Sequence, residues 1–454
     1  QREIVIRNAE IEWLDELRGA PPLALRSLQF RLRNFGEVHR IGLSARPPRE
    51  LGSGVELRAS LVGRSVTQPG AWNGRVYAEL GATDLAGWRT WFDYPVEVTS
   101  GQGALRVWVT FGAGKLVDGT ADLALAGVVA RLDADLPPLR LASVAGRVQG
   151  RQTEHGYEFG VRRLAMVPES GPAMRDTTFR ASWEAARGAQ PPRGAVSADL
   201  VELLPLARLA EFLPFPADLR KLLAELAPRG RLLAANFEWS GELPDAARFS
   251  SRARFEGLSM SAWRAIPGFA NLSGRVEATE SRGNLSLASQ NSEIDLPRVF
   301  PEPRIRLASL SGEVGWERAA GGLTVRLARL AFANADLAGT ASGSYTYAGE
   351  GPGSIDLAAL LNRANGAHLQ RYLPLASIMG EKTRNWLAGA IQGGQASDTR
   401  LRLRGALRDF PFRDPAKGEF QVVAQVRDAT LAFAQGWPAV EDIDGELLFE
   451  RDRM

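Results

Sequence analysis

The feature that most constrains the fold of this chain is the alternation of apolar and polar residues along most of its 454 positions. Leu401 and Leu403, for example, alternate with Arg400, Arg402 and Arg404. Successive side chains of a β-strand point to opposite faces, so this period of two predicts strands with one apolar and one polar face. The same pattern occurs at residues 27–34, 55–63, 105–111, 122–132, 284–289, 323–330 and 419–426. We therefore expect a mostly β, antiparallel chain.

Helix-like spacing is confined to two clusters, near 199–227 and near 356–392, with a weaker one at 85–92. The first cluster places Leu219, Leu222, Leu223 and Leu226 on one face, and the second carries Tyr372, Leu373, Trp386 and Leu387. An apolar stripe needs a partner surface, so we expect these helices to lie across the apolar strand face or to cap its edge.

Two sequence recurrences indicate internal repetition. Residues 140–148 and 306–314 agree at six of nine positions, and residues 197–204 and 354–361 agree at five of eight. In a repeat protein each unit stacks only on its neighbours. These spacings predict an incomplete first unit at 1–137, a full unit at 138–304 and a further unit at 305–454, as successive parts of one sheet.

A glycine flanked by apolar residues two positions away recurs at Gly146, Gly274, Gly312 and Gly445. Glycine inside a strand often marks a bulge or a close backbone approach that lets the sheet bend. Alternatively, each glycine merely begins a strand after a turn.

The sequence offers little for catalysis or metal binding, so we expect a protein that is not an enzyme, with no catalytic residues, metal site or cofactor. Cysteine is absent, and His39, His155 and His368 lie far apart without partners at ligand spacing. Residues 111–119 resemble the end of a phosphate-binding loop, but Leu116 stands where such loops carry Ser or Thr, so a hairpin turn is expected. Scattered carboxylates leave a β-helix carbohydrate-active enzyme as a less favoured alternative.

Charge and hydropathy limit the partners. The net charge is +3, and the basic residues, nearly all arginine, alternate with acids without forming a basic block, so nucleic acid is not expected. The longest uncharged stretches, residues 337–349 and 385–397, are shorter than the roughly 18 residues that a membrane-spanning helix needs. Because the chain begins at Gln1, we expect that it is a fragment whose signal or anchor lies upstream. Most of the eleven tryptophans are expected in the core or in a groove wall.

Residues 372–412 carry the most distinctive motifs: Tyr372-Leu373-Pro374, Trp386-Leu387, Gly393-Gly394 and Phe410-Pro411-Phe412. Together with the alternating strand that ends at Gly405, this region resembles the YhdP family, AsmA-like proteins related to TamB. The resemblance covers most of the chain from about residue 70 onward.

The resemblance implies an elongated, solenoid-like, repeating antiparallel β-groove, a curled sheet with short helical insertions in each repeat. It also implies a periplasmic location, an N-terminal anchor in the inner membrane that we expect to lie upstream of this fragment, and a reach toward the outer membrane. Family members are implicated in phospholipid transport and in the outer-membrane permeability barrier, so the expected partners are phospholipids, both membranes and possible envelope proteins.

One set of alternating apolar residues is predicted to line the groove and bind lipid: Leu105, Val107, Val109, Phe111, Leu123, Leu125, Leu285, Leu287, Val325, Leu327, Leu401 and Leu403. An open apolar groove would shield a lipid's acyl chain from water. The alternative is a rigid periplasmic scaffold for envelope assembly, in which the same faces close against each other as a dry sandwich. Sequence alone leaves both open, because an apolar strand face looks the same in either arrangement.

Overall fold

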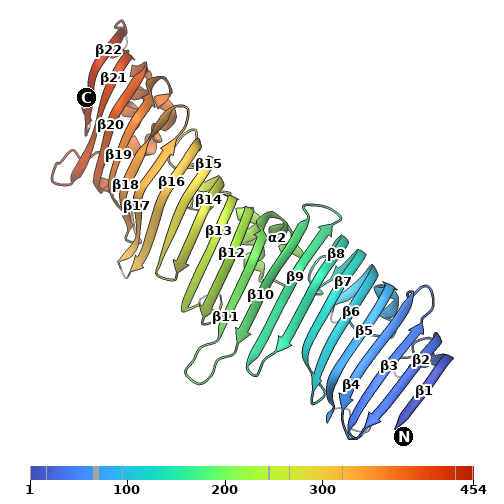
Figure 1. Cartoon of the computed structure of the whole chain (residues 1–454). Helices are drawn as coiled ribbons and strands as arrows, with labels where there is room; N and C mark the ends of the chain where they lie inside the picture. Colours follow the sequence, from blue (N-terminus) through green and yellow to red (C-terminus); the bar gives the residue numbers. More distant parts are fainter. Residues whose placement is uncertain are drawn as a thin grey trace. The chain divides into compact units, whose positions relative to one another are not determined.

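The computed structural model describes residues 2–16, 18–64, 71–94, 96–243, 246–264, 266–319, 321–434, 436–451 and 453. The chain forms two compact units, residues 1–224 with 234–246 (unit 1) and residues 225–233 with 247–454 (unit 2). Strands dominate both (Figure 1), and the prediction of a mostly β, antiparallel, groove-like sheet with short helical insertions is confirmed. The boundary between the units falls inside β12 (Arg229–Ser240), whereas the predicted division at residues 137 and 304 stays a prediction.

Unit 1 contains eleven consecutive strands among its described residues. They are β1 (Glu3–Trp13), β2 (Leu23–Phe35), β3 (Val38–Arg46), β4 (Gly54–Val62), β5 (Asn73–Asp84), β6 (Glu97–Gly112), β7 (Lys115–Arg131), β8 (Leu139–Gln152), β9 (Gly156–Pro168), β10 (Met174–Glu184) and β11 (Arg193–Glu202). The helix α1 (Leu85–Trp88) follows β5, and α2 (Leu203–Leu209), η2 (Ala210–Phe212) and α3 (Ala217–Leu226) follow β11.

Unit 2 repeats this organisation. Its strands are β13 (Arg248–Met260), β14 (Gly268–Thr279), β15 (Arg282–Asp295), β16 (Arg304–Ala319), β17 (Gly322–Ala333), β18 (Leu337–Tyr347), β19 (Ser354–Asn365), β20 (Ile391–Ala406), β21 (Gly418–Leu431) and β22 (Val440–Glu450). Between β19 and β20 lie η3 (Gly366–Tyr372), α4 (Ala376–Met379) and α5 (Glu381–Ala390), and η4 (Leu407–Asp409) follows β20.

Each strand pairs antiparallel with the next one along the chain, from β1 to β11 in unit 1 and from β13 to β22 in unit 2. Short hairpins join many of these pairs. The loop-like segment 111–119 is one of them, as predicted, because β6 ends at Gly112, β7 begins at Lys115, and Ala113 and Gly114 take the positive φ angles of a tight turn.

Residues with positive φ also occur inside strands, at points where the pairing register shifts. Arg163, Arg329 and Asp398 are examples, each beside a shift between neighbouring strands. An extra residue at such a bulge bends its strand and increases the local twist. The recurrence of bulges therefore gives each unit a way to curl its sheet.

The recurring glycine flanked by apolar residues marks a close backbone approach at three of its four positions. A Cβ atom at Gly146 would lie 2.7 Å from the Leu164 Cα, and one at Gly274 would lie 2.0 Å from the Ser286 carbonyl oxygen. Gly312 is equally crowded by β17, whereas nothing lies within 4 Å of a Cβ at Gly445. All four glycines lie inside strands, so the alternative that they begin strands after turns is wrong.

The helical prediction needs two corrections. Residues 356–365, expected to be helical, belong to strand β19, and the strand β11 continues to Glu202 before α2 begins. The Leu- and Ala-rich composition of 356–365 favours a helix, but hydrogen bonding to both β18 and β20 outweighs that local preference. Among the described residues, no helix is both long and apolar enough to span a membrane.

Candidate functional site

The candidate site is the apolar face of the sheet, and in unit 1 cross-strand register joins it into a continuous row. Residues directly opposite each other in an antiparallel pair project from the same face. From β1 to β11 the successive partners are Ile6, Phe30, Leu43, Leu57, Ala78, Val107, Ala121, Val148, Val161, Phe179 and Ala198. No polar side chain interrupts this row, which we call row 1.

Unit 2 contains an equivalent row. From β13 to β21 the successive partners are Ala253, Val276, Leu285, Val314, Leu327, Gly343, Leu357, Leu403 and Phe420, which we call row 2. Register thus connects apolar residues that are more than 150 positions apart in sequence into one surface.

The structure brings many of the predicted lining residues together. Val107 lies in row 1, and Leu105 pairs directly with Leu123 one step along the same face. Leu285, Leu327 and Leu403 lie in row 2.

The remaining predicted residues lie on the same faces in parallel rows. Val109 pairs with Val76, Phe111 with Gly74, Leu125 with Val144, Leu287 with Gly274, Val325 with Tyr345, and Leu401 with Val422. Whether these side chains contact lipid stays a prediction.

This face is covered only in part. Of the twelve predicted lining residues Leu125 is buried, and the other eleven are half-buried. On β9 and β10 the same face leaves Phe159 and Trp183 more than 40% exposed. The solvent-accessible surface of the chain is 27795 Å². Two globular proteins, each of half its mass, would together expose about 20,000 Å², so this chain leaves more surface in contact with water than closed globular folds would.

The buried clusters are local, drawn from consecutive strands and nearby loops and helices. One unit 1 cluster combines Val98, Leu125 and Val144 of β6, β7 and β8 with Leu209 of α2. The largest unit 2 cluster has Phe255 and Leu272 of β13 and β14 beside Leu307 and Leu310 of β16. Among the described residues, no cluster joins strands distant in pairing order, as the core of two face-to-face sheets would.

Helices cover one end of the apolar face in unit 1, where Figure 1 draws α2 behind β9 and β10. Leu209, Phe212 and Leu213 pack against the cluster of β6 to β8. The predicted stripe of α3 is different, because no residue of that helix is buried. The expectation that helices lie against the sheet is therefore met by α2 and η2.

At the first strands of unit 1, α1 has the same role. Trp88 and Trp91 pack against Leu23 and Leu51. The indole N–H of Trp88 donates to the Leu51 carbonyl oxygen at 3.1 Å and to the Thr83 hydroxyl at 2.8 Å, which satisfies the polar atom of this buried ring.

In unit 2 a polar cluster holds η3 beside the loop between β17 and β18. The Asp336 carboxylate, largely buried, accepts hydrogen bonds from His368 at 2.6 Å, Arg371 at 3.0 Å and Tyr372 at 3.0 Å. Burial raises the pKa of Asp336, but these three hydrogen bonds outweigh it and leave the pKa below its usual value. Adjacent Leu373 is buried, so Tyr372 and Leu373 of the family-like motif anchor this segment.

The Phe410-Pro411-Phe412 motif also has a structural role. Phe412 is fully buried, and its ring lies over Gly405 and Gly418, which pair directly between β20 and β21. A Cβ atom at either glycine would come within 2.7 Å of the Phe412 ring. The aromatic ring thus fills the space that the paired glycines leave open.

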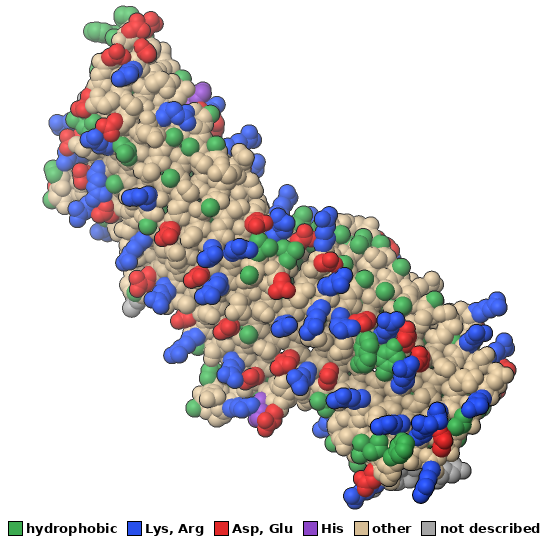
Figure 2. Space-filling model, in the orientation of Figure 1, with side chains coloured by type: hydrophobic (Ala, Val, Ile, Leu, Met, Phe, Trp, Pro, Cys, Tyr) green, Lys and Arg blue, Asp and Glu red, His purple; other side chains and the backbone are tan. Residues whose placement is uncertain are grey.

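Charged side chains gather on the opposite face, which Figure 2 displays with many arginines exposed. Arg147 of β8 donates to both oxygens of Asp122 on β7, at 2.5 and 2.8 Å, and this bidentate pair lowers the pKa of Asp122. Arg402 of β20 bonds Asp356 of β19 and lowers its pKa in the same way. Such pairs join neighbouring strands on the polar face. Rows 1 and 2, on the other face, contain no ionisable residue.

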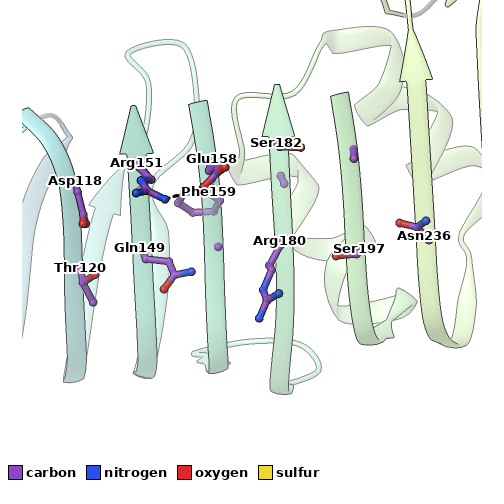
Figure 3. Close-up of a pocket in the computed structure, with 14 residues that line it drawn as sticks. Asp118, Thr120, Gln149, Arg151, Glu158, Phe159, Arg180, Ser182, Ser197 and Asn236 are labelled. Atoms are coloured by element: carbon purple, nitrogen blue, oxygen red, sulfur yellow. Dashed lines mark ion pairs between the residues drawn. The ribbon is translucent and has the colours of Figure 1, made fainter. Parts of the chain in front are cut away.

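A hollow of about 630 Å³ lies on the polar face of β7 to β11 and is also lined by Asn236 of β12. Figure 3 shows the residues that line it on neighbouring strands, and Arg151 is paired there with Glu158 at 3.9 Å. Among the described residues, no group of three or more His, Asp or Glu side chains has the geometry of a metal site.

Sequence reasoning missed several members of the rows, notably Phe30, Phe179, Val161 and Phe420. Their strands also alternate, but only the pairing register shows that they continue the same surface. It also missed that arginines from separate strands gather on the polar face, because no basic block exists in sequence.

Comparison with known proteins agrees with this architecture. A relative from Escherichia coli (strain K12), the intermembrane phospholipid transporter YhdP, is 24% identical over 393 residues, which cover 84% of this chain and 30% of the relative. The chain thus spans less than a third of that relative's length. No solved structure matches the chain. The model of the YhdP family, described as YhdP protein, matches residues 1–454, and the chain therefore belongs to the YhdP family.

Proposed function

We propose that the chain carries phospholipid acyl chains along its apolar faces, in the periplasm between the inner and outer membranes, and so supports the outer-membrane permeability barrier. The observation that carries the proposal is the pair of unbroken apolar rows, most of whose residues are half-exposed. The similarity to an intermembrane phospholipid transporter supports it. In this role the chain binds and conducts lipid without catalysing a reaction, and it needs no cofactor.

The energetics favour such a surface for lipid passage. Moving an acyl chain of about sixteen carbons through water costs roughly 0.8 kcal/mol per methylene, on the order of 12 kcal/mol. Strands lie about 4.8 Å apart, so the eleven strands of row 1 offer about 50 Å of apolar surface. The acyl chain can remain against this surface while the charged headgroup stays in water.

A dry structural scaffold would require the same rows to be covered. Within the described residues the buried clusters come from neighbouring strands and from helices at one end of the sheet. Most row residues stay half-exposed, and Val161, Ala198 and Ala253 are the buried ones. A lipid chain is a suitable cover because it needs no fixed side-chain complementarity, only an apolar surface that water otherwise contacts.

The test is whether protein purified without detergent carries phospholipid. Mass spectrometry of a solvent extract should detect it, and delipidated protein should take labelled phosphatidylethanolamine from vesicles. Val107→Asp in row 1 should abolish uptake, whereas Ala104→Asp, an exposed position on the opposite face of the same strand, should leave it unchanged. Absence of both co-purified lipid and uptake would contradict the proposal and favour the scaffold.

A further inference from the structure

The polar face of unit 1 contains a second hollow, of about 530 Å³, across β2 to β7. Five arginines line it: Arg31, Arg33, Arg40, Arg58 and Arg75. They come from four strands, and Asp118 is the carboxylate that lines the same hollow. A volume of this size is in the range of small-molecule sites.

The register places like charges side by side. Arg33 of β2 lies directly opposite Arg40 of β3, and Arg40 is followed across β4 by Ser60 and then by Arg75 of β5. Like charges directly opposite each other destabilise a sheet unless an anion compensates them. Arg40 and Arg75 lie two strand spacings apart, about 10 Å, with only the small Ser60 between them. Their guanidinium groups can therefore reach one anion from both sides.

Two carboxylates near the hollow, Glu3 and Glu56, are already engaged with the other arginines. Glu3 accepts from Arg31 and Arg33, both at 2.8 Å, and Glu56 pairs with Arg58. Among the ion pairs of the described residues, none includes Arg40 or Arg75, although the guanidinium of Arg40 lies over the Phe35 ring. Two guanidinium groups are thus left with donors for an external acceptor.

Aromatic side chains form one wall of the hollow. Tyr77 and Trp108 have ring centroids 5.3 Å apart, and Trp108 is 38% exposed. Arg58 lies over Tyr77, and Arg147 lies over Trp108 with its guanidinium carbon 5.6 Å from the ring centroid. Trp108 lines the same hollow as Arg40 and Arg75. A hollow that offers both an exposed indole and unpaired guanidinium groups suits a ligand with an anionic group and a carbon skeleton.

We propose that this hollow binds a phosphate ester, with Arg40 and Arg75 holding the phosphate oxygens and Trp108 packing against the attached carbon skeleton. Arginine suits a phosphate because its planar fork of N–H donors matches two oxygens at once. The phosphate ester is that of a lipid headgroup or of a soluble organic phosphate, which present the same chemistry. The site lies on the face opposite row 1, so it does not depend on the acyl-chain proposal.

The test compares the whole chain with Arg40→Ser/Arg75→Ser and with the control Arg140→Ser/Arg175→Ser. The control removes the same charge from exposed arginines of β8 and β10 in the same unit, for which the described residues show no ion pair. Glycerol 3-phosphate binding is measured by titration calorimetry, and vesicle binding by co-sedimentation with phosphatidylcholine vesicles with or without phosphatidylglycerol.

The proposal predicts that the Arg40/Arg75 variant binds at least tenfold more weakly while the control stays within twofold of the unsubstituted chain. Binding of glycerol 3-phosphate assigns the site to soluble phosphate esters, and binding of phosphatidylglycerol vesicles alone assigns it to lipid headgroups. Absence of binding to either probe, or equal losses in both variants, would overturn the site. If the phosphate site fails this test, the chain can still take up phosphatidylethanolamine, and Val107→Asp can still block that uptake. The two proposals can therefore fail separately.

Discussion

Leu403→Asp places a charge in row 2 and separates a lipid path from a dry core. Leu403 is half-buried between Leu357 and Phe420, its direct partners on β19 and β21. Full burial of a leucine contributes about 1.5–3 kcal/mol, so losing a half-buried one should lower the free energy of unfolding by about 1 kcal/mol. The carboxylate can keep its water, because this face is open.

The effect on lipid passage should be larger. A hydrated carboxylate would uncover three or four methylenes of a passing acyl chain, which costs about 3 kcal/mol, or roughly a hundredfold in passage. The assay is transfer of fluorescent phospholipid between donor and acceptor vesicles, beside urea unfolding followed by tryptophan fluorescence. Leu360→Asp is the matched control, because Leu360 is exposed on the polar face of β19 opposite Arg400.

The predicted result is lost transfer with nearly unchanged stability for Leu403→Asp, and no change in either for Leu360→Asp. A loss of more than about 4 kcal/mol, or failure to fold, would place Leu403 in a closed core and refute the open face. Unchanged transfer would show that row 2 is not the path.

Three further changes test the supporting structure. Gly146→Ala should destabilise unit 1 by about 1–3 kcal/mol in urea unfolding, because its Cβ would meet the backbone of β9 at a φ of +146°, whereas Gly150→Ala on the same strand should be tolerated. Trp88→Phe should cost about 1–2 kcal/mol, since two buried hydrogen bonds are lost. Asp336 has a lowered pKa in the folded state, so its contribution is present above about pH 4 and lost below it. Asp336→Asn should therefore weaken unfolding stability at neutral pH and reduce its loss between pH 4 and pH 2.

Alternation was sufficient to predict most strands, because a period of two is a local property of residues such as those around Leu105 and Leu403. It failed at 356–365, where leucine and alanine occupy both faces and the preference for a strand comes from partners on either side. Apolar residues on both faces hide the period of two that marks a strand. The prediction therefore followed the leucine- and alanine-rich composition, which favours a helix.

The sequence predicted which residues lie on the apolar face, but not which of them meet across strands to form rows 1 and 2. Which residues meet across strands depends on bulges such as those at Arg163 and Asp398, and bulges have no clear local signature when the residue with positive φ is not glycine. The arginine hollow was invisible for the same reason, because Arg40 and Arg75 are brought together only by the pairing of β3, β4 and β5.

Site-specific photo-crosslinking in cells tests the central claim most directly. A photoreactive residue replaces Val107, Leu327 or Leu403 on the apolar face, with exposed Ala104, Ala328 and Arg404 as opposite-face controls on the same three strands. An open lipid-carrying face predicts phospholipid adducts at the first three positions and none at the controls. Absence of adducts on the apolar face, or equal labelling of both faces, would contradict it.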